Sequence, residues 1–337
     1  MISPLVSVIV LNFNGKQHLP VCLTALCNQT YTPIEILLVD NGSTDGSLDL
    51  VHENFRGVRT LALRENLGFC GGNNAGIRQA RGEYIALLNN DTEADDRWIA
   101  ESVFALEANP EAGFTASRIR LFDRRDRLDT AGDLYFRTGY PGKRGFLLPD
   151  GPEFDKPEWV FGSCAGAAVY RRTMLDEIGL LDEDFFSYIE DTDLSFRAQL
   201  AGYRCLYVPT AVIYHKVGAT AGQDSPLRQL WSHRNHWYTL IKNLPGALIL
   251  EYAPQIIIAE VLVFYSAVRK QRLRVFLKAR VEVLRNLSRM ISKRRKVQKL
   301  RKVSSAYIDS LIRKDWITFR RAEKERISQE KTAPANY

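Results

Sequence analysis

The chain is organised around the stretch Leu87-Leu88-Asn89-Asn90-Asp91-Thr92-Glu93. It follows Glu83-Tyr84-Ile85-Ala86, so an apolar run of β-type residues ends abruptly in a polar cluster. A buried parallel strand presents functional groups in this way at its carboxyl end, where open α/β sheets bind their ligands. The Asp91 carboxylate is a hard oxygen ligand suited to Mg²⁺ or Mn²⁺. Alternatively, Asn90-Asp91-Thr92 caps a helix that begins near Asp95-Asp96-Arg97-Trp98.

Three further apolar runs precede this strand, at residues 6–11, 34–39 and 58–63. Helical patterns lie between the runs, and the one at residues 68–80 begins in a glycine-rich loop. Strands that alternate with helices at this spacing predict an α/β chain with a doubly wound, mostly parallel sheet flanked by helices. Polar residues follow the strands, so we expect the functional rim at one edge of the sheet.

The first strand-to-helix turn argues against two other nucleotide-binding classes. It reads Asn12-Phe13-Asn14-Gly15, whereas a dinucleotide-binding fold requires G-x-G-x-x-G at this point. A sugar-nucleotide pyrophosphorylase would need a glycine-rich, basic first turn. The sequence also contains no Walker A motif.

A second acidic cluster, Glu190-Asp191-Thr192-Asp193, lies where the apolar spacing predicts the start of a helix. The helix dipole favours carboxylates in a first turn, so ordinary capping is one interpretation. The other is a general base, since a carboxylate held near the metal can deprotonate a hydroxyl. His215 ends a strand predicted at 211–215, after another at 203–208. It is either a structural histidine or the nitrogen ligand that complements Asp91.

Four motifs in order carry a resemblance to a known family. They are residues 6–15, Asp40-Asn41-Gly42-Ser43-Thr44-Asp45, residues 66–76, and Leu88-Asn89-Asn90-Asp91. The chain resembles family 2 glycosyltransferases with the GT-A fold, and in particular rhamnosyltransferase-like members that build bacterial surface polysaccharides. The resemblance extends from Val6 to about Lys242.

The resemblance implies a nucleotide-diphosphate sugar donor, dTDP- or UDP-linked, and a site for each of its parts. Asp40 would bind the pyrimidine, Asp91 and His215 would hold Mg²⁺ or Mn²⁺, and Asp191 would be the base, with Glu190 as the second candidate. The motif Asn89-Asn90-Asp91 has one carboxylate where the family has two. The donor-binding candidates are Asn12, Asn14, Asp40, Asn66, Gly68, Asn73, Asn90 and Arg234.

Between residues 117 and 159 the hydrophobic pattern weakens. Arg124-Arg125-Asp126-Arg127 and the Gly/Pro-rich residues 139–157 read as loops over the active face. Such loops are either related to the acceptor or merely irregular.

The charge is distributed unevenly along the chain. The chain has 46 Lys and Arg and 39 Asp and Glu. Residues 269–302 contain 15 of the basic residues and one of the acidic residues, so the rest of the chain has a net charge of −7. A basic arm of this kind binds an anionic membrane surface or a nucleic acid. The arm lacks interleaved aromatic residues that stack on bases, so we expect no nucleic acid partner.

The apolar residues 247–268 precede this arm. They are long enough to span a bilayer, but Glu251 and Glu260 interrupt them, which favours helices that lie on the membrane surface. We therefore expect a GT-A domain at residues 1–243 and a helical, basic, membrane-associating region at 244–337. We also expect residues up to Lys242 to fold and bind donor without the arm.

The remaining features concern location. The five cysteines are odd in number and lack metal-site spacing, which predicts free thiols in a reducing compartment. The N-terminus shows no signal-peptide pattern.

We expect an inverting glycosyltransferase, peripheral on the cytoplasmic face of the membrane, that moves a sugar such as rhamnose to a lipid-linked glycan. The alternatives are a non-catalytic membrane-bound scaffold and a polyanion-binding protein.

Overall fold

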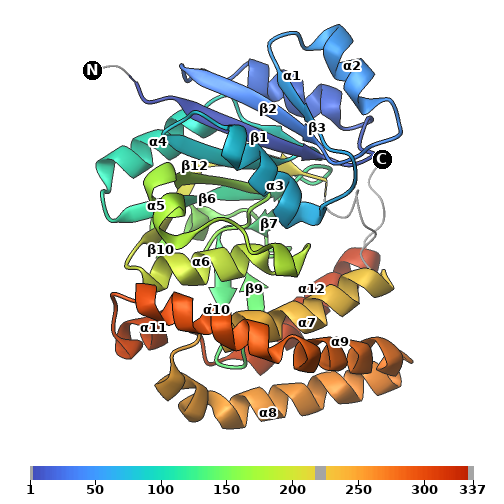
Figure 1. Ribbon diagram of the computed structural model, residues 1–337, viewed down its shortest axis with the longest axis vertical. Helices are drawn as coiled ribbons and strands as arrows, with labels where there is room; N and C mark the ends of the chain where they lie inside the picture. Colours follow the sequence, from blue (N-terminus) through green and yellow to red (C-terminus); the bar gives the residue numbers. More distant parts are fainter. Residues whose placement is uncertain (1–2, 217–224, 333–337) are drawn as a thin grey trace.

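The computed structural model describes residues 3–216 and 225–332, which contain a ten-stranded sheet (Figure 1). Its strands lie in the order β10-β12-β6-β11-β4-β1-β2-β3, with β5 beside β12 and β7 beside β6. The strands are β1 Val6–Asn12, β2 Ile34–Asp40, β3 Arg59–Ala62, β4 Tyr84–Asn89, β5 Thr92–Ala94, β6 Ala112–Leu121, β7 Leu128–Thr130, β10 Glu158–Val160, β11 Ala167–Arg171 and β12 Arg204–His215. A separate hairpin joins β8 (Asp133–Tyr135) to β9 (Pro141–Lys143).

The predicted α/β class with a GT-A-type sheet is confirmed. Strands β4, β1, β2 and β3 are parallel neighbours, whereas β11 runs antiparallel to both β4 and β6, so the sheet is mixed. The two strands predicted at 203–208 and 211–215 form the single strand β12. A register shift between Val208 and Val212 lets this strand stay paired with β6 along its length.

Helices cover both faces of the sheet because the buried strands are apolar on both sides. Alternate residues divide between two cores, with Ile9 and Leu87 in one and Val8 and Leu88 in the other. The helices of this part are α1 Leu19–Cys27, α2 Ser47–Asn54, α3 Gly68–Gln79, α4 Trp98–Ala108, α5 Arg172–Ile178 and α6 Glu190–Leu200. Single 3₁₀ turns occur at Pro152–Phe154 (η1) and Glu183–Phe185 (η2).

The idea that Asn90-Asp91-Thr92 caps the next helix is wrong. Strand β5 follows Asp91 directly, and α4 begins only at Trp98, without a side-chain cap. Strand β5 pairs with the end of β12, where Thr92 lies opposite His215. Tertiary pairing therefore uses this segment to bring the ends of β4 and β12 together.

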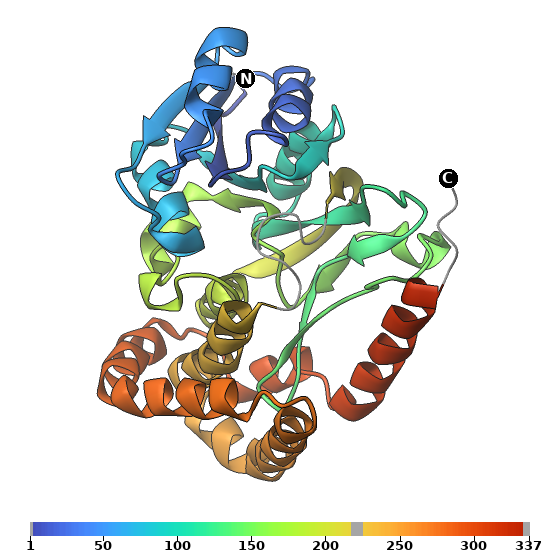
Figure 2. The ribbon, with the colours of Figure 1, turned by 90° about the vertical axis from the view of Figure 1, so that its right-hand side faces the viewer.

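The region from 117 to 159 is more ordered than its sequence suggests. It contains β7, β10 and the β8–β9 hairpin, which reaches from the sheet to the C-terminal helices (Figure 2). At the tip of the hairpin, Arg137 forms ion pairs with Glu251, at 3.0 Å, and with Asp309, at 2.6 Å. These long-range contacts order a segment whose local pattern is weak.

Among the described residues, five helices lie in the extension predicted at 244–337, and α7 (Pro226–Asn243) precedes them; all six lie below the sheet in Figure 1. The five are α8 Gly246–Arg269, α9 Leu273–Arg285, α10 Leu287–Leu300, α11 Ser305–Leu311 and α12 Trp316–Thr332. Val283 of α9 and Met290 of α10 belong to the same buried cluster as Tyr238 of α7 and the sheet residue Ile9. The extension thus shares its core with the domain that precedes it.

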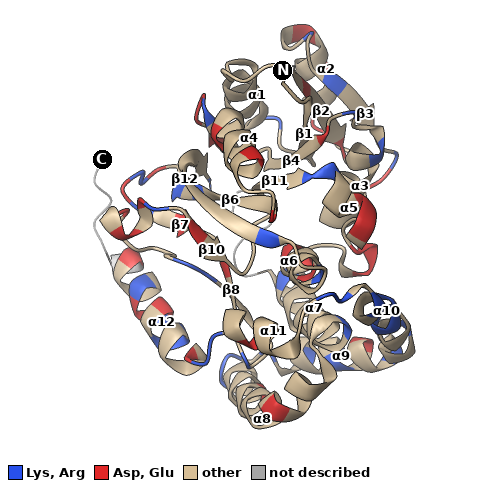
Figure 3. Ribbon diagram, turned by 90° about the vertical axis from the view of Figure 1, so that its left-hand side faces the viewer, with Lys and Arg blue, Asp and Glu red and all other residues tan. Residues whose placement is uncertain are grey.

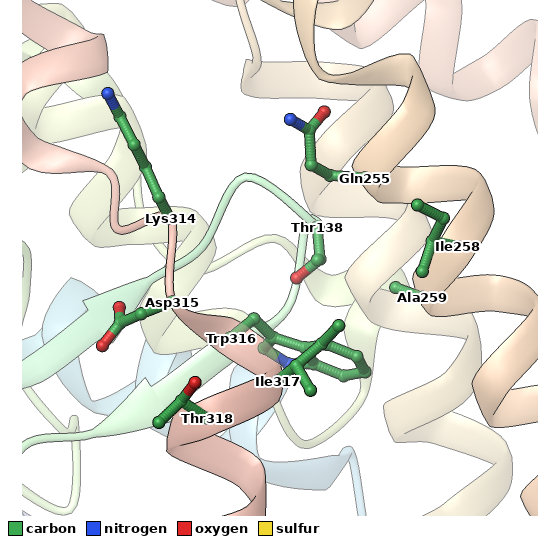
Figure 4. Close-up of a pocket in the computed structure, with 9 residues that line it drawn as sticks. All are labelled: Thr138, Gln255, Ile258, Ala259, Lys314, Asp315, Trp316, Ile317 and Thr318. Atoms are coloured by element: carbon green, nitrogen blue, oxygen red, sulfur yellow. The ribbon is translucent and has the colours of Figure 1, made fainter.

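A cavity of about 180 Å³ lies between α8 and the start of α12 (Figure 4). Ile258 and Trp316 line it, together with Thr138 at the tip of the β8–β9 hairpin. Because Asp133 and Lys143 lie at the other end of this hairpin, the cavity is separate from the sheet edge that carries the strand-end residues.

Candidate active site

Three side chains at the ends of β1, β2 and β4 form a buried hydrogen-bonded chain. Asn90 Nδ2 donates to Asn12 Oδ1 at 2.7 Å, and Asn12 Nδ2 donates to Asp40 Oδ1 at 3.0 Å. The parallel register sets Asn12 directly beside Asp40. Each carboxylate oxygen can accept more than one hydrogen bond, so Asp40 can still accept a hydrogen bond from a nucleobase.

Asn14 and Gly15 shape the turn after β1. Asn14 has a φ of +49°, and its Oδ1 accepts from the backbone N–H of Thr44 at 2.8 Å. A Cβ at Gly15 would lie 2.1 Å from Asn90 Nδ2, so only glycine fits there. These two residues therefore position the strand-end network, and a direct contact of Asn14 with a donor stays a prediction.

Residues 66–73, which comprise the turn before α3 and the first part of that helix, connect the strand ends to the segment before Glu190. Asn66 Oδ1 accepts from Asn41 Nδ2 at 2.9 Å and from the N–H of Gly68 at 2.8 Å. Gly68 has a φ of +72°, and a Cβ there would come within 2.5 Å of the Phe186 carbonyl oxygen. Asn73 is buried and donates to the Phe69 carbonyl one turn earlier. Their roles in donor binding stay predictions.

Asp91 and His215 are brought together by the β5–β12 pairing. His215 Nε2 lies 3.4 Å from Asp91 Oδ1, a buried oxygen with no hydrogen-bond partner among the described residues. His215 Nδ1 lies 2.9 Å from Oδ2 of Asp129, and Lys143 Nζ donates to Asp129 Oδ1 at 2.6 Å. Burial alone would lower the pKa of His215, but the Asp129 and Asp91 carboxylates raise it to about 9.

These residues fit a divalent cation. An unpartnered carboxylate oxygen beside an imidazole nitrogen offers a mixed oxygen and nitrogen donor set, which Mn²⁺ and Mg²⁺ sites accept together with phosphate oxygens. The described part of the chain holds no group of three or more His, Cys, Asp or Glu side chains placed to bind one ion. The protein would therefore supply Asp91 and His215, and the remaining ligands would come from substrate and water.

The buried Glu190 and Asp133 and the partly buried Asp191 are close enough in space to influence one another's charge. Burial and the charge of Asp191 raise the pKa values of Glu190 and Asp133 well above their ordinary range. Burial also raises the pKa of Asp191, although the N–H groups of Thr192, at 2.7 Å, and Ala165 donate to its carboxylate. Glu190 Oε2 has no partner among the residues the structure describes. The negative charge is therefore better stabilised on Asp191 than on Glu190.

The segment before Glu190 is strained and is held from α7. Phe186, Tyr188 and Ile189 have φ angles between +62° and +72°, which non-glycine residues rarely adopt. The fully buried Asn235 donates to the carbonyls of Phe185, Ser187 and Tyr188 at 2.8–3.0 Å. Strain of this kind persists only where the surroundings enforce it, and it is concentrated at functional sites.

Arg234 supports the same segment. Its Nη2 donates to the carbonyls of Asp184, at 3.1 Å, and Phe185, at 3.0 Å, and its Nη1 forms an ion pair with Glu282 of α9. These contacts make Arg234 a positioning residue for the loop that leads to Asp191. Its predicted contact with the donor diphosphate stays a prediction.

Sequence reasoning missed Asp129, Asp133 and Lys143 as site residues, and it named Asn235 only as the neighbour of Arg234 in a helix near the donor. The first three lie in the region of weak pattern, where no motif marks them. Alternating short apolar runs around Leu128 and Leu134 were the only local signal for β7 and β8.

Two solved structures with a similar fold contain a nucleotide or nucleotide sugar together with Mn²⁺. One is GalNAc-T7 with UDP, GalNAc and Mn²⁺, with a TM-score of 0.58 and 17% identity over 71% of this chain and 48% of that one. Another is a mannosyltransferase from Pyrobaculum calidifontis with GDP-Man and Mn²⁺, with a TM-score of 0.53 and 17% identity over 91% and 86%. At this identity the likeness shows the fold alone.

The sequence comparisons go further. The chain is 28% identical over 267 residues to the N-acetylglucosaminyl-diphospho-decaprenol L-rhamnosyltransferase of Mycobacterium tuberculosis, covering 69% of this chain and 83% of the relative. It is 35% identical over 221 residues to an uncharacterized glycosyltransferase of Haemophilus influenzae, covering 64% and 66%. The model of glycosyl transferase family 2 matches residues 7–179, and that of glycosyl transferase family group 2 matches residues 154–292. The chain therefore belongs to glycosyl transferase family 2.

Proposed function

We propose that this chain is a metal-dependent, inverting glycosyltransferase that moves a sugar from a nucleotide diphosphate to a lipid-linked glycan. The observation that carries the proposal is the buried Asp91 carboxylate oxygen, which accepts no hydrogen bond from the described residues and faces His215 at the sheet edge that also holds Asn12 and Asp40. A non-catalytic scaffold has no need for a buried carboxylate oxygen that lacks a hydrogen bond, because such a group costs stability.

The chemistry is a direct displacement. Asp191 takes the proton of an acceptor hydroxyl, whose oxygen bonds to the anomeric carbon of the donor sugar from the face opposite the leaving group. The bond from that carbon to the diphosphate oxygen breaks, and the electron pair departs with the diphosphate, so the configuration inverts. A divalent ion held by Asp91 and His215 would stabilise the negative charge of the diphosphate.

The relatives guide the choice of substrate. The relative from Mycobacterium tuberculosis is named for a rhamnose transfer to a diphosphate-linked lipid. We infer that the donor of this chain is a dTDP- or UDP-linked sugar, with rhamnose the first to test. Its product would serve synthesis of a bacterial surface glycan.

Thermal stabilisation by nucleotide sugars tests the site. With Mn²⁺ present, a dTDP- or UDP-sugar should raise the melting temperature. In the variants Asp91→Ala and His215→Ala, most of the part of this rise that depends on Mn²⁺ should be lost. Asp96→Ala and His52→Ala serve as matched controls, since both residues are exposed and lie outside the site. Donor binding and turnover that persist in EDTA, and that neither site variant changes, would sink the proposed metal site.

We also propose that α8 and α9 lie on the cytoplasmic surface of the membrane. Among the described residues, α8 is the one helix long and apolar enough to cross a bilayer. It lies farthest from the N-terminal strands (Figures 1 and 2) and exposes a row of apolar side chains. The exposed apolar residues of this face are Leu250, Ile257, Ile258, Val261, Leu262, Phe264, Tyr265 and Val268, and on α9 Leu277, Val281 and Leu284.

The inner side of α8 argues for lying on the membrane over spanning it. Glu260 accepts from Tyr140, at 3.1 Å, and from Trp237, at 3.1 Å, and pairs with Arg280 at 2.7 Å. Burial would raise the pKa of Glu260, but His236 and Arg280 lower it to about 2, so the carboxylate stays ionised. A spanning helix would have to break these contacts and carry the charge into hydrocarbon, at several kcal/mol.

Basic residues follow the apolar face along the chain and are dense on α10 (Figure 3). Exposed members include Arg269, Lys270, Arg274, Lys278 and Arg285. Anionic headgroups should contribute about 1 kcal/mol for each basic residue near the surface, an attraction that salt screens.

Vesicle sedimentation tests this surface. The full chain should bind phosphatidylserine vesicles more tightly than phosphatidylcholine vesicles, and salt should weaken the binding without abolishing it. Ile257→Glu with Val261→Glu should remove most binding, whereas Phe104→Glu, at the exposed Phe104 of α4, should not. Equal binding to both lipids at every salt concentration would refute the electrostatic contribution to membrane binding. Tighter binding to a polynucleotide than to either lipid would refute the assignment of this face to the membrane.

A further inference from the structure

We propose that Asp129 is a positioning residue that fixes the orientation and tautomer of His215 for metal binding. The inference deepens the proposed function and rests on the metal site proposed there. Asp129 lies on β7, and its side chain is completely buried. No motif of the sequence marks it.

The geometry keeps a proton on Nδ1 of His215, whether the ring is charged or neutral. Nδ1 lies 2.9 Å from Asp129 Oδ2, and a carboxylate can only accept a hydrogen bond, so Nδ1 is the donor. In the neutral ring the lone pair is then on Nε2, which points at the unpartnered Oδ1 of Asp91, 3.4 Å away. Asp129 thereby leaves the nitrogen that faces Asp91 available to a cation. A ring free to flip or change tautomer would offer that nitrogen only part of the time.

Lys143 stabilises the ionised carboxylate of Asp129, which is the form that accepts a hydrogen bond from His215 Nδ1. Its Nζ donates to Asp129 Oδ1 at 2.6 Å, so each carboxylate oxygen has a different partner, Lys143 on one side and His215 on the other. The two contacts fix the carboxylate in position and orientation. Asp129 is therefore unable to turn away from the imidazole.

The β8–β9 hairpin that carries Lys143 is held in place by other parts of the fold. Lys143 ends β9 and lies opposite Asp133 across the hairpin. The tip of the hairpin is anchored by the ion pair of Arg137 with Asp309 and by Tyr140, which stacks on His236 at 4.2 Å between ring centroids. The metal ligand His215 is thus oriented by a hairpin that is itself held by the C-terminal helices.

Mn²⁺ affinity of the full-length protein, measured by electron paramagnetic resonance of free Mn²⁺, tests the inference. The double variant Asp129→Leu/Lys143→Met replaces the ion pair between the buried Asp129 and the partly exposed Lys143 with apolar side chains of similar size, which keeps the fold from holding an unpaired buried charge. We expect it to bind Mn²⁺ 10- to 100-fold more weakly than the wild type, the range for lost support of a ligating histidine. Asp129→Asn/Lys143→Met retains an acceptor oxygen and should recover part of the affinity.

Two comparisons separate positioning from a merely structural role. The single variant Lys143→Met removes the ion pair but keeps Asp129 beside His215, so it should bind Mn²⁺ more tightly than the Asp129→Leu double variant. Nitrogen NMR of labelled histidines, with Mg²⁺ bound and with His215→Gln for assignment, should report a protonated Nδ1 that the double variant loses. If all three variants bind Mn²⁺ equally, Asp129 is not a positioning residue.

The test also distinguishes this inference from the site on which it rests. If Asp91→Ala and His215→Ala leave Mn²⁺ affinity unchanged, the proposed metal site is wrong. If those two variants weaken binding and the Asp129→Leu double variant does not, the metal site stands and the role of Asp129 is overturned.

Discussion

Asp191→Asn is expected to lower the rate of sugar transfer by roughly 10²–10⁴-fold, the range for a positioned acid–base group. Asparagine keeps the size of the side chain and an acceptor oxygen for the N–H groups of Thr192 and Ala165, but it cannot take a proton. The fold should therefore persist, and donor affinity should change by less than a few-fold. Steady-state transfer to a soluble acceptor analogue, with calorimetric donor binding in parallel, measures both quantities.

Glu190→Gln provides the matched comparison. Glu190 is buried, one of its oxygens has no hydrogen-bond partner among the described residues, and burial together with the charge of Asp191 raises its pKa well above the ordinary range, which disfavours its charged form. A neutral amide should replace such a group with a smaller loss of rate than Asp191→Asn causes. If Asp191→Asn transfers normally and Glu190→Gln abolishes transfer, Glu190 is the base.

The pH profile gives an independent check on the same carboxylate. Because burial raises the pKa of Asp191, protonation begins at a higher pH than for an ordinary aspartate, which titrates at about 3.9. A base works only when unprotonated, so kcat/KM should fall as the pH drops through this raised value. An acid limb at or below the ordinary value would contradict the assignment.

Truncation after Lys242 is expected to abolish cooperative folding, contrary to what the charge pattern alone suggested. Helices α9 and α10 bury one side of α7, and Val283 and Met290 lie in the central core. Re-exposing each large apolar side chain costs about 1.5–3 kcal/mol. A handful of them exceeds the total stability of about 5–15 kcal/mol that is typical of a domain.

Charge adds to this loss. Lys293 of α10 pairs with Asp182 and, at 2.6 Å, with Asp184, while Lys242 shares Asp182 and is itself buried. These acids immediately precede the strained loop that leads to Asp191. Removing α10 therefore takes Lys293 and Arg289 away from Asp184 and leaves Asp182 with Lys242 alone, in the segment that leads to the proposed base.

Circular dichroism during heating, together with donor binding, measures the effect of truncation. The truncated chain should melt without a cooperative transition and should not bind donor, whereas the full chain should do both. A truncated protein with a sharp transition and normal donor affinity would instead establish residues 1–242 as an independent domain and restore the predicted boundary at 243/244.

The sequence alone determined the parallel half of the sheet and its functional edge. Each apolar run there is long enough to be a buried strand, and each is followed by polar residues, so Asn12, Asp40 and Asp91 meet wherever these strands lie side by side. That inference needs only local pattern and one general property of parallel sheets. The helix at Glu190 was predictable for the same reason, because its periodicity and its acidic first turn are adjacent in the chain.

Only the tertiary structure decided how the edge is completed. His215 reaches Asp91 through the pairing of β5 with β12, and Asp129 reaches His215 across 86 residues of sequence. Asn235 enforces positive φ angles in a loop that no local propensity would favour. Such contacts depend on which segments become neighbours, and the sequence near Asp129 or Asn235 carries no periodic signal of that choice. The same physics explains α9 and α10, whose charge suggested an independent arm although their buried faces complete the core.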